Sequence, residues 1–160
     1  MDREKMTRAL KDATSNVMDR MFFQPVHFAD SAHSLEEWFS HHRPLIGSSI
    51  NFSGPLQGSL YLLMPAALAT EITASFLGLE KDEISKEQEK DTLKEALNMV
   101  GGHMLSLVDK GGAFHLGLPE LMEEMELSCD SGKEPKGETL FMQTENHRLA
   151  MGITISESKA

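Results

Sequence analysis

The sequence predicts an α+β domain with an antiparallel sheet, an N-terminal helix and two central helices, and we expect this single domain to span residues 1–160. Three observations support the prediction. Apolar residues recur at helical spacing near the N-terminus, alternate in the stretch SSINFSG, and return to helical spacing after Pro65. Apolar side chains then alternate with smaller or polar ones in the C-terminal segment RLAMGITI. Helices and strand pairs in this order are typical of the α+β class.

The first helix is expected over residues 3–22, and Pro25 follows it. In the segment 26–44 the sequence indicates one short helix, because Ser34-Leu-Glu-Glu has the form of a capping box before Trp38. The apolar stripe of the first helix recurs at helical spacing and consists of Met6, Ala9, Leu10, Ala13, Val17 and Met21.

A β-hairpin is expected next, formed by SSINFSG and SLYLLMP. Ile50 and Phe52 share one face of the first strand, and the glycines and proline of GPLQG predict the turn. Pro65 suits the first turn of the following helix, which Gly78 ends.

A charged stretch, residues 79–90, leads to a long helix that is expected to end near Lys110. The remainder predicts strands. AFHLGL is one candidate, LMEEMELSC is ambiguous between strand and helix, and SGKEPKG is a polar turn. ETLFMQ and RLAMGITI predict a closing hairpin around TENH, since apolar residues alternate along the second segment.

Composition narrows the classes of function. The formal net charge is −10, and the chain has no cluster of Lys and Arg, which argues against nucleic-acid binding. The single cysteine, Cys129, excludes a disulfide within the chain and suits a reducing compartment. The longest apolar run is LYLLMPAALA, about half the length needed to span a bilayer. We therefore expect a cytoplasmic protein that binds neither membrane nor nucleic acid.

The long helix carries a polar face that includes glycine. Asp91, Glu95, Asn98 and Gly102 fall on one side of a helical wheel. Gly102 would leave bare backbone beside two polar side chains, so that another molecule could approach closely, whereas Gly101 would permit tight packing against the sheet. The opposite side is the expected core stripe, formed by Leu93, Leu97, Val100, Met104 and Val108.

Two interpretations of this face remain open from the residues alone. Exposed Glu and Asn side chains are usually solvated surface without a further role. Asn and glycine are, however, poor helix formers, and this local cost favours a function for the polar face.

Glu95-Ala-Leu-Asn98 is an ExxN motif that Gly101 and Gly102 follow, downstream of the hairpin INFSGPLQGSLYLLMP and a helix that ends in FLGLE. This order resembles the CheX/CheC family of chemotaxis phosphatases, most clearly over residues 50–107. The resemblance implies a phosphatase for the phospho-aspartate of a CheY-like response regulator. A single ExxN motif is similar to the CheX type, whose members tend to be homodimers.

The resemblance implies catalytic roles for Glu95 and Asn98. Because Asp91 and Gly102 share the polar face with them, we expect these two residues to contact the partner. Asn98 would orient the attacking water, and Glu95 would pair with a lysine in the active site of the receiver domain. Mg²⁺ would belong to the receiver, so no cofactor is expected on this chain. The alternative is a non-catalytic CheX-like interaction module in a two-component pathway.

Other constellations have simpler explanations. His27, His33, His41 and His42 precede the first clear strand, but they lack the ligand set that zinc requires, so we expect no metal site. Cys129 lacks any nucleophile motif and is interpreted as a structural thiol. Methionines at helical positions, such as Met18, Met21, Met99 and Met104, are interpreted as core residues rather than as an adaptable partner surface.

Overall fold

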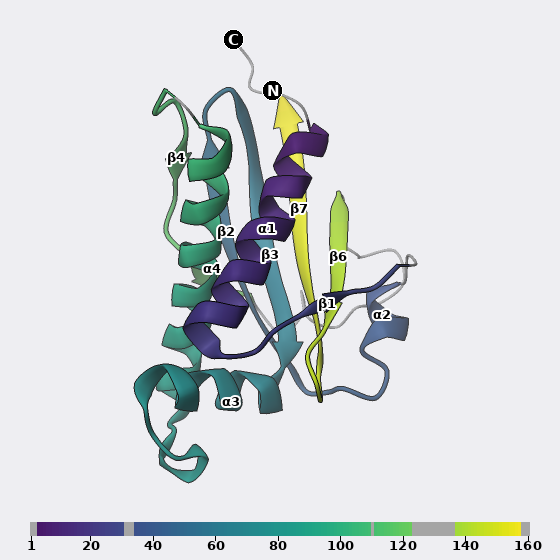
Figure 1. The fold of residues 1–160 in the computed structure, drawn as a ribbon, viewed down its shortest axis with the longest axis vertical. Helices are drawn as coiled ribbons and strands as arrows, with labels where there is room; N and C mark the ends of the chain where they lie inside the picture. The colour runs from purple at the N-terminus through teal and green to yellow at the C-terminus, as the bar shows by residue number, and fades with distance from the viewer. Residues whose placement is uncertain (1–2, 31–33, 110, 123–136, 158–160) are drawn as a thin grey trace.

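The computed structural model describes residues 3–30, 34–109, 111–122 and 137–157, and this part of the chain forms helices on an antiparallel sheet (Figure 1). The helices are α1 (Arg3–Phe22), α2 (Leu35–Trp38), α3 (Ala66–Leu77) and α4 (Lys86–Val108), with a 3₁₀ turn η1 (Lys81–Glu83). The strands are β1 (His27–Phe28), β2 (Leu45–Ser53), β3 (Leu56–Pro65), β4 (His115–Leu116), β5 (Glu120–Leu121), β6 (Glu138–Gln143) and β7 (Arg148–Glu157). The predicted α+β class is confirmed.

The sheet runs in the order β1-β6-β7-β3-β2-β4, and β5 also pairs with β2. All strand pairs are antiparallel. In the centre, Leu60 of β3 lies opposite Ile50 of β2 and Ile153 of β7. Both predicted hairpins are present, since β2 pairs with β3 and β6 pairs with β7.

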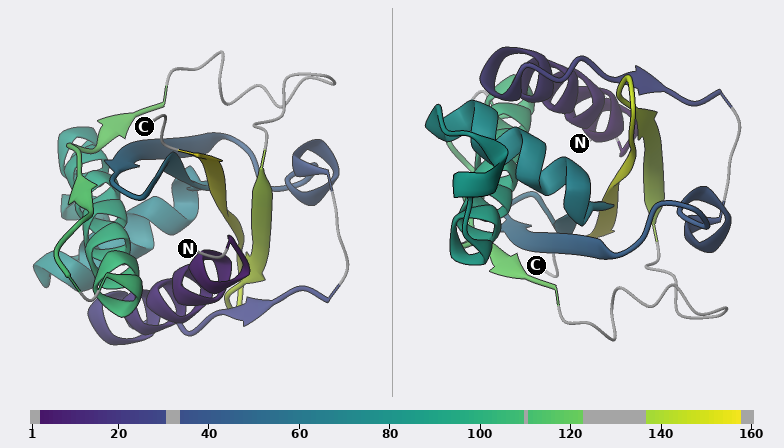
Figure 2. Two further views of the ribbon diagram at one scale, coloured as in Figure 1. Left: turned by 90° about the horizontal axis from the view of Figure 1, so that it is seen from above. Right: turned by 90° about the horizontal axis from the view of Figure 1, so that it is seen from below.

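The helices cover the two faces of the sheet unequally. Helices α1, α3 and α4 lie against one face, and α2 lies on the other (Figures 1 and 2). Side chains alternate between faces along a strand, so β3 sends Leu60 and Leu62 into the main core and Tyr61 and Leu63 toward α2.

Helix α1 is confirmed at residues 3–22, with one error in its apolar stripe. Met21 is 41% exposed, whereas Met18 and Phe22 are buried. The last turn of α1 also packs against α3, through the rings of Phe22 and Phe76, 5.4 Å apart. The buried stripe therefore rotates away from Met21 at this end.

The short helix expected at Ser34 is confirmed as α2. The Ser34 hydroxyl accepts a hydrogen bond from the backbone N–H of Glu37 (3.1 Å), as an N-cap does. Trp38 is buried, and its indole N–H donates to the Leu149 carbonyl of β7 (3.1 Å). The guanidinium of Arg148 covers the Trp38 ring at 4.4 Å. These contacts fix α2 on the sheet.

Helix α3 begins directly where β3 ends. Pro65 is the last residue of β3 and the N-cap of α3, one position earlier than the first turn that we predicted. Gly78 ends the helix with φ 68°, a left-handed conformation that favours glycine. None of the helices within the described residues is long and apolar enough to cross a membrane.

Several predicted boundaries shift. Helix α4 begins at Lys86, within the charged stretch 79–90, and it ends at Val108, close to the predicted end near Lys110. AFHLGL provides only the two residues of β4. LMEEMELSC contributes Leu121 to β5, and beyond Met122 it lies outside the described residues. SGKEPKG lies outside them too, apart from Gly137, as do Cys129 and His33.

Candidate functional site

The first turn of α4 is fixed by a reciprocal capping box. The Ser85 hydroxyl accepts a hydrogen bond from the backbone N–H of Gln88 (3.1 Å), and the Gln88 side chain accepts one from the backbone N–H of Ser85 (2.9 Å). Glu87 and Glu89 lie in the same turn, where negative charge is favoured by the helix dipole. The polar face that begins at Asp91 therefore starts from a well-defined helix end.

Two hydrogen bonds tie α4 to its neighbours. The buried Ser48 hydroxyl of β2 donates to the Leu93 carbonyl (3.2 Å). The Thr70 hydroxyl of α3 donates to the Glu89 carboxylate. The buried side of α4 includes all of the core stripe predicted from the sequence: Leu93, Leu97, Val100, Met104 and Val108.

The four residues predicted for the site share the exposed side of α4. Asp91, Glu95, Asn98 and Gly102 are exposed. Because positions three and four apart are neighbours on a helix, Glu95 lies beside both Asp91 and Asn98, and Gly102 lies one turn beyond Asn98. The predicted exposure of this face is confirmed, while the catalytic and contact roles of its residues stay predictions.

The two glycines of α4 have different surroundings. A Cβ atom on Gly101 would lie 3.0 Å from the Leu116 side chain of β4, so this glycine permits close packing, as predicted. A Cβ atom on Gly102 would meet nothing within 4 Å. The backbone at Gly102 is therefore open to another molecule next to the Asn98 amide.

A groove borders the polar face where α3 meets α4. It has a volume of about 420 Å³, and its walls include Phe76 and Leu77 of α3 and Asp91, Thr92 and Glu95 of α4. Asn98 and Gly102 are not among the residues that line it. The structure thus divides the predicted site into a groove with two carboxylates and an open strip with an amide and bare backbone.

Sequence reasoning missed Phe76 and Leu77 as surface residues. Both are exposed in the last turn of α3. Two large apolar residues directly before a helix-ending glycine are a sequence signal, because the last turn of a helix often projects beyond the core. The signal cannot by itself show that this turn borders α4.

The carboxylate of Asp109 shapes the chain where α4 ends. It accepts hydrogen bonds from the backbone N–H groups of Phe114 (2.9 Å), Ala113 (2.9 Å) and Gly111 (3.3 Å). The bond from Phe114, followed by that from Ala113, lowers the pKa of Asp109 below its ordinary value. This turn carries the chain into β4, whose Leu116 packs on Gly101.

The polar face supplies limited chemistry of its own. The Asn98 amide offers both a donor and an acceptor, and the Glu95 carboxylate offers acceptors and a negative charge. An amide does not act as a general base at neutral pH, so Asn98 suits the orientation of a small molecule such as water. Across the described residues, no three His, Cys, Asp or Glu side chains lie close enough together to hold a metal ion.

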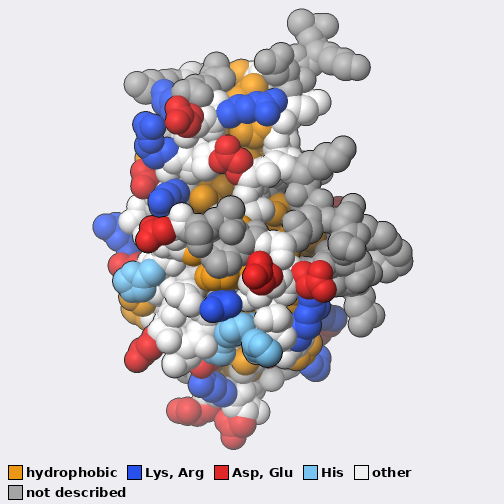
Figure 3. Space-filling view, turned by 90° about the vertical axis from the view of Figure 1, so that its right-hand side faces the viewer, with side chains coloured by type: hydrophobic (Ala, Val, Ile, Leu, Met, Phe, Trp, Pro, Cys, Tyr) orange, Lys and Arg blue, Asp and Glu red, His pale blue; other side chains and the backbone are white. Residues whose placement is uncertain are grey.

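His41, His42 and His147 form a group of histidines outside α4. The side that carries α2 shows histidine side chains among mixed charges (Figure 3). Burial lowers the pKa of His42, and the nearby charges of Arg148, His147 and His41 lower it further. His147 contacts the Glu71 carboxylate through Nε2 at 3.3 Å. These are interactions with neighbouring charges, not a shared ligand set.

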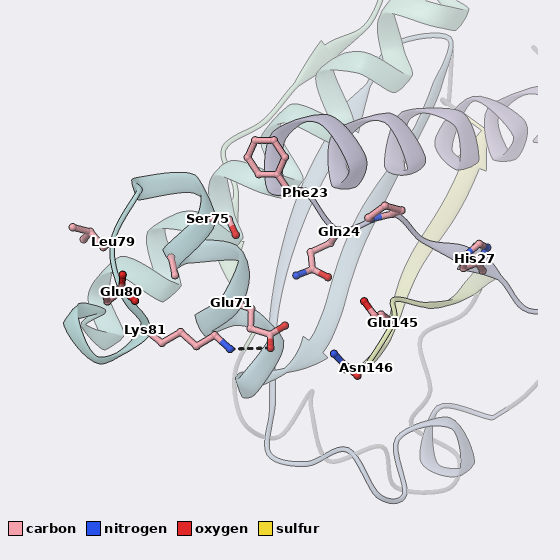
Figure 4. Close-up of a pocket in the computed structure, with 12 residues that line it drawn as sticks. Phe23, Gln24, His27, Glu71, Ser75, Leu79, Glu80, Lys81, Glu145 and Asn146 are labelled. Carbon is pink, nitrogen blue, oxygen red and sulfur yellow. Dashed lines mark hydrogen bonds and ion pairs between the residues drawn. The ribbon is translucent and has the colours of Figure 1, made fainter.

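A second, larger cleft lies between the end of α1, α3 and the turn from β6 to β7 (Figure 4). It measures about 730 Å³, and Glu71 reaches across one side to pair with Lys81 at 3.2 Å. Glu145 and Asn146 border it from the turn. Its charges of both signs are partly paired, and it contains none of the four predicted site residues.

Comparison with known sequences finds a family model that covers much of the chain. The sequence model of a family described as chemotaxis phosphatase CheX matches residues 46–144, which include Glu95, Asn98 and both glycines of α4. No curated protein matches the chain.

Solved structures share the fold at low sequence identity. A CheX from Vibrio vulnificus is 19% identical, with a TM-score of 0.73 over 98% of this chain and 99% of that chain. A CheC-like protein from Shewanella oneidensis is 17% identical, with a TM-score of 0.72 over 97% and 100%. A chain of a CheX-CheY-BeF3-Mg²⁺ complex from Borrelia burgdorferi is 19% identical, with a TM-score of 0.69 over 94% and 97%. Since the family model spans more than half of the sequence, the chain belongs to the CheX family of chemotaxis phosphatases.

Proposed function

We propose that this protein hydrolyses the phospho-aspartate of a CheY-like receiver domain. The observation that carries the proposal is the exposure of Glu95 and Asn98 on one face of α4, beside open backbone at Gly102. Membership of the CheX family supports it, as does the description of the Borrelia structure as a complex of CheX with CheY, BeF3 and Mg²⁺.

The reaction requires little covalent chemistry from the protein. Water attacks phosphorus, the bond between phosphorus and the aspartyl oxygen breaks, and inorganic phosphate and the free carboxylate of the receiver result. An acyl phosphate is already reactive, so that correct placement of the water is the main requirement. The Asn98 amide would orient this water through its oxygen and nitrogen, as a glutamine does in GTPases.

Glu95 would act in docking. Its carboxylate would pair with a lysine in the active site of the receiver and so fix the register of α4 over the phosphoryl group. Mg²⁺ bound in the receiver would neutralise the phosphoryl oxygens. The homodimer that the resemblance implies stays a prediction.

The test compares hydrolysis with binding. Receiver domains labelled with acetyl phosphate should lose phosphate faster when the protein is added. Asn98→Ala should lower the rate by about 100-fold or more, because removal of one group that acts in the transition state has effects of this size. Its affinity for a BeF3-loaded receiver should remain close to wild type, since the amide acts mainly in the transition state.

Glu95→Ala is the contrasting variant. It should weaken both binding and hydrolysis, because its carboxylate would contribute to docking. Hydrolysis by Asn98→Ala at nearly the wild-type rate would contradict the mechanism. Binding by the wild-type protein without any hydrolysis would instead favour a non-catalytic interaction module.

A further inference from the structure

We infer that the groove between α3 and α4 binds a lysine or arginine side chain of the receiver domain, beside its phosphorylation site. This inference rests on the proposed function and extends it, because it assigns a specificity contact outside the ExxN motif. The long side chain would lie along Phe76 and Leu77, and its charge would reach Asp91 at the mouth of the groove.

The shape and chemistry of the groove support such an occupant. Phe76 and Leu77 provide apolar walls, while Asp91 and Glu95 provide two carboxylates. Lysine and arginine match this pattern because their methylene groups pack on apolar surface while the charged end stays in water. A cation near the Phe76 ring gains a further favourable interaction.

The apolar wall is held in place before any partner binds. The Phe76 ring packs against the buried Phe22 ring at 5.4 Å. Gly78 ends α3 directly after Leu77, and the N–H of Leu79 donates to the Ala74 carbonyl (3.1 Å), which closes the last turn. A rigid wall lowers the entropy cost of binding.

The groove is continuous with the predicted catalytic face through Glu95, which belongs to both. A receiver that presents its phosphoryl group to Asn98 would therefore place neighbouring surface over the groove. Asp91 is available for a new contact, because its side chain is largely exposed and its pair with Lys94 is long, at 3.8 Å. Exposed pairs of this kind contribute little stability.

CheY-type receiver domains from the same genome are first loaded with BeF3 and Mg²⁺, and the one that binds the wild-type protein most tightly is chosen. The experiment then measures the affinity of each variant for this receiver. Leu77→Ala should weaken binding about tenfold, as truncation of a buried interface contact does. The matched control is Leu107→Ala. Leu107 is 43% exposed against 42% for Leu77, but it lies about 18 Å along α4 from Glu95.

A charge reversal at Asp91 tests whether this carboxylate contacts the charged end of the receiver side chain. Asp91→Lys should weaken binding about tenfold or more at low salt, and the loss should shrink in about 0.5 M salt because exposed charges are screened. Glu36→Lys changes the net charge equally but lies on α2, on the other face of the sheet. This control should bind like the wild-type protein.

The outcomes separate the inference from the proposed function. If Leu77→Ala and Asp91→Lys bind the receiver like the wild-type protein, the groove inference is wrong even where hydrolysis is present. If both variants weaken binding but the wild-type protein releases no phosphate, the inference that the groove binds the receiver is retained and the catalytic proposal fails. A change in self-association without a change in receiver affinity would assign the groove to a second copy of this chain and overturn the inference.

Discussion

Gly101 and Gly102 follow one another in α4 but serve different surfaces. Gly101 faces Leu116 of β4 and Leu60 of β3, where an added Cβ atom would be 3.0 Å and 3.6 Å from their side chains. Gly102 faces open space. Each glycine costs the helix about 1 kcal/mol relative to alanine. At Gly101 close packing offsets this cost, whereas at Gly102 no neighbouring atom within the described residues requires a glycine.

The comparison of the two glycines shows how a residue that the fold requires can be distinguished from one that only a partner requires. A glycine that the fold needs cannot be enlarged without moving its neighbours. A glycine that only a partner needs can be enlarged without harm to the fold, and the loss then appears in activity. Gly101 and Gly102 provide both cases at adjacent positions.

Of the two glycines, Gly102 is expected to have the larger effect on activity when it is replaced, in the variant Gly102→Leu. The new side chain would stand beside Asn98 and hold the receiver away, and a displacement of about 1 Å can lower a rate about 100-fold. Phosphate release should fall by about this factor, while the melting temperature should stay unchanged or rise because leucine favours helix. Gly102→Ala is the smaller control and should retain more activity. Full activity in Gly102→Leu would show that no partner approaches this strip.

The opposite result is expected from Gly101→Leu. Its side chain would collide with Leu116 and Leu60, and overpacking of this kind costs about 1–3 kcal/mol. The free energy of unfolding, measured with denaturant, should fall by about this amount, reduced by the gain in helix propensity. Activity per folded molecule should change less than in Gly102→Leu. A stability equal to that of Gly102→Leu would contradict the difference between the two glycines.

The sequence was informative where local signals agree with tertiary packing. The alternation in β2, the capping pattern at Ser34 and the polar face of α4 were all identified, because each depends on a few neighbouring residues. The motif ExxN was recognised from its position after the hairpin, and its exposure followed from the helical period alone.

The errors lie where distant parts of the chain meet. Met21 was placed in the core because its spacing fits the stripe, but the last turn of α1 buries Met18 and Phe22, whose ring packs on Phe76 of α3. Strand β1 was not predicted, because it has only two residues and is defined by its pairing with the distant strand β6, in which His27 lies opposite Gln143. The groove beside Glu95 arises from the crossing of α3 and α4, which periodicity within either helix does not encode.

The smallest effect on stability is expected from a change in the Asp109 turn, which connects α4 to β4. Asp109→Asn replaces the charged carboxylate that accepts hydrogen bonds from the backbone N–H groups of Phe114, Ala113 and Gly111. An amide has only one acceptor oxygen, so at least one of the bonds to its two oxygens is lost. The variant should be less stable than the wild-type protein at pH 7, as measured by its denaturant midpoint.

The pH dependence distinguishes this charge from a simple loss of packing. The pKa of Asp109 in the folded protein is lowered from an ordinary value of 3.8, so the folded state releases this proton more readily than the unfolded state. Its stabilising contribution is therefore present above pH 3.8 and is lost as the pH falls through the lower pKa of the folded state. The difference in stability between the wild-type protein and Asp109→Asn should shrink as the pH at which unfolding is measured falls below 3.8. A difference that stays constant would mean that the Asp109 charge does not stabilise the turn.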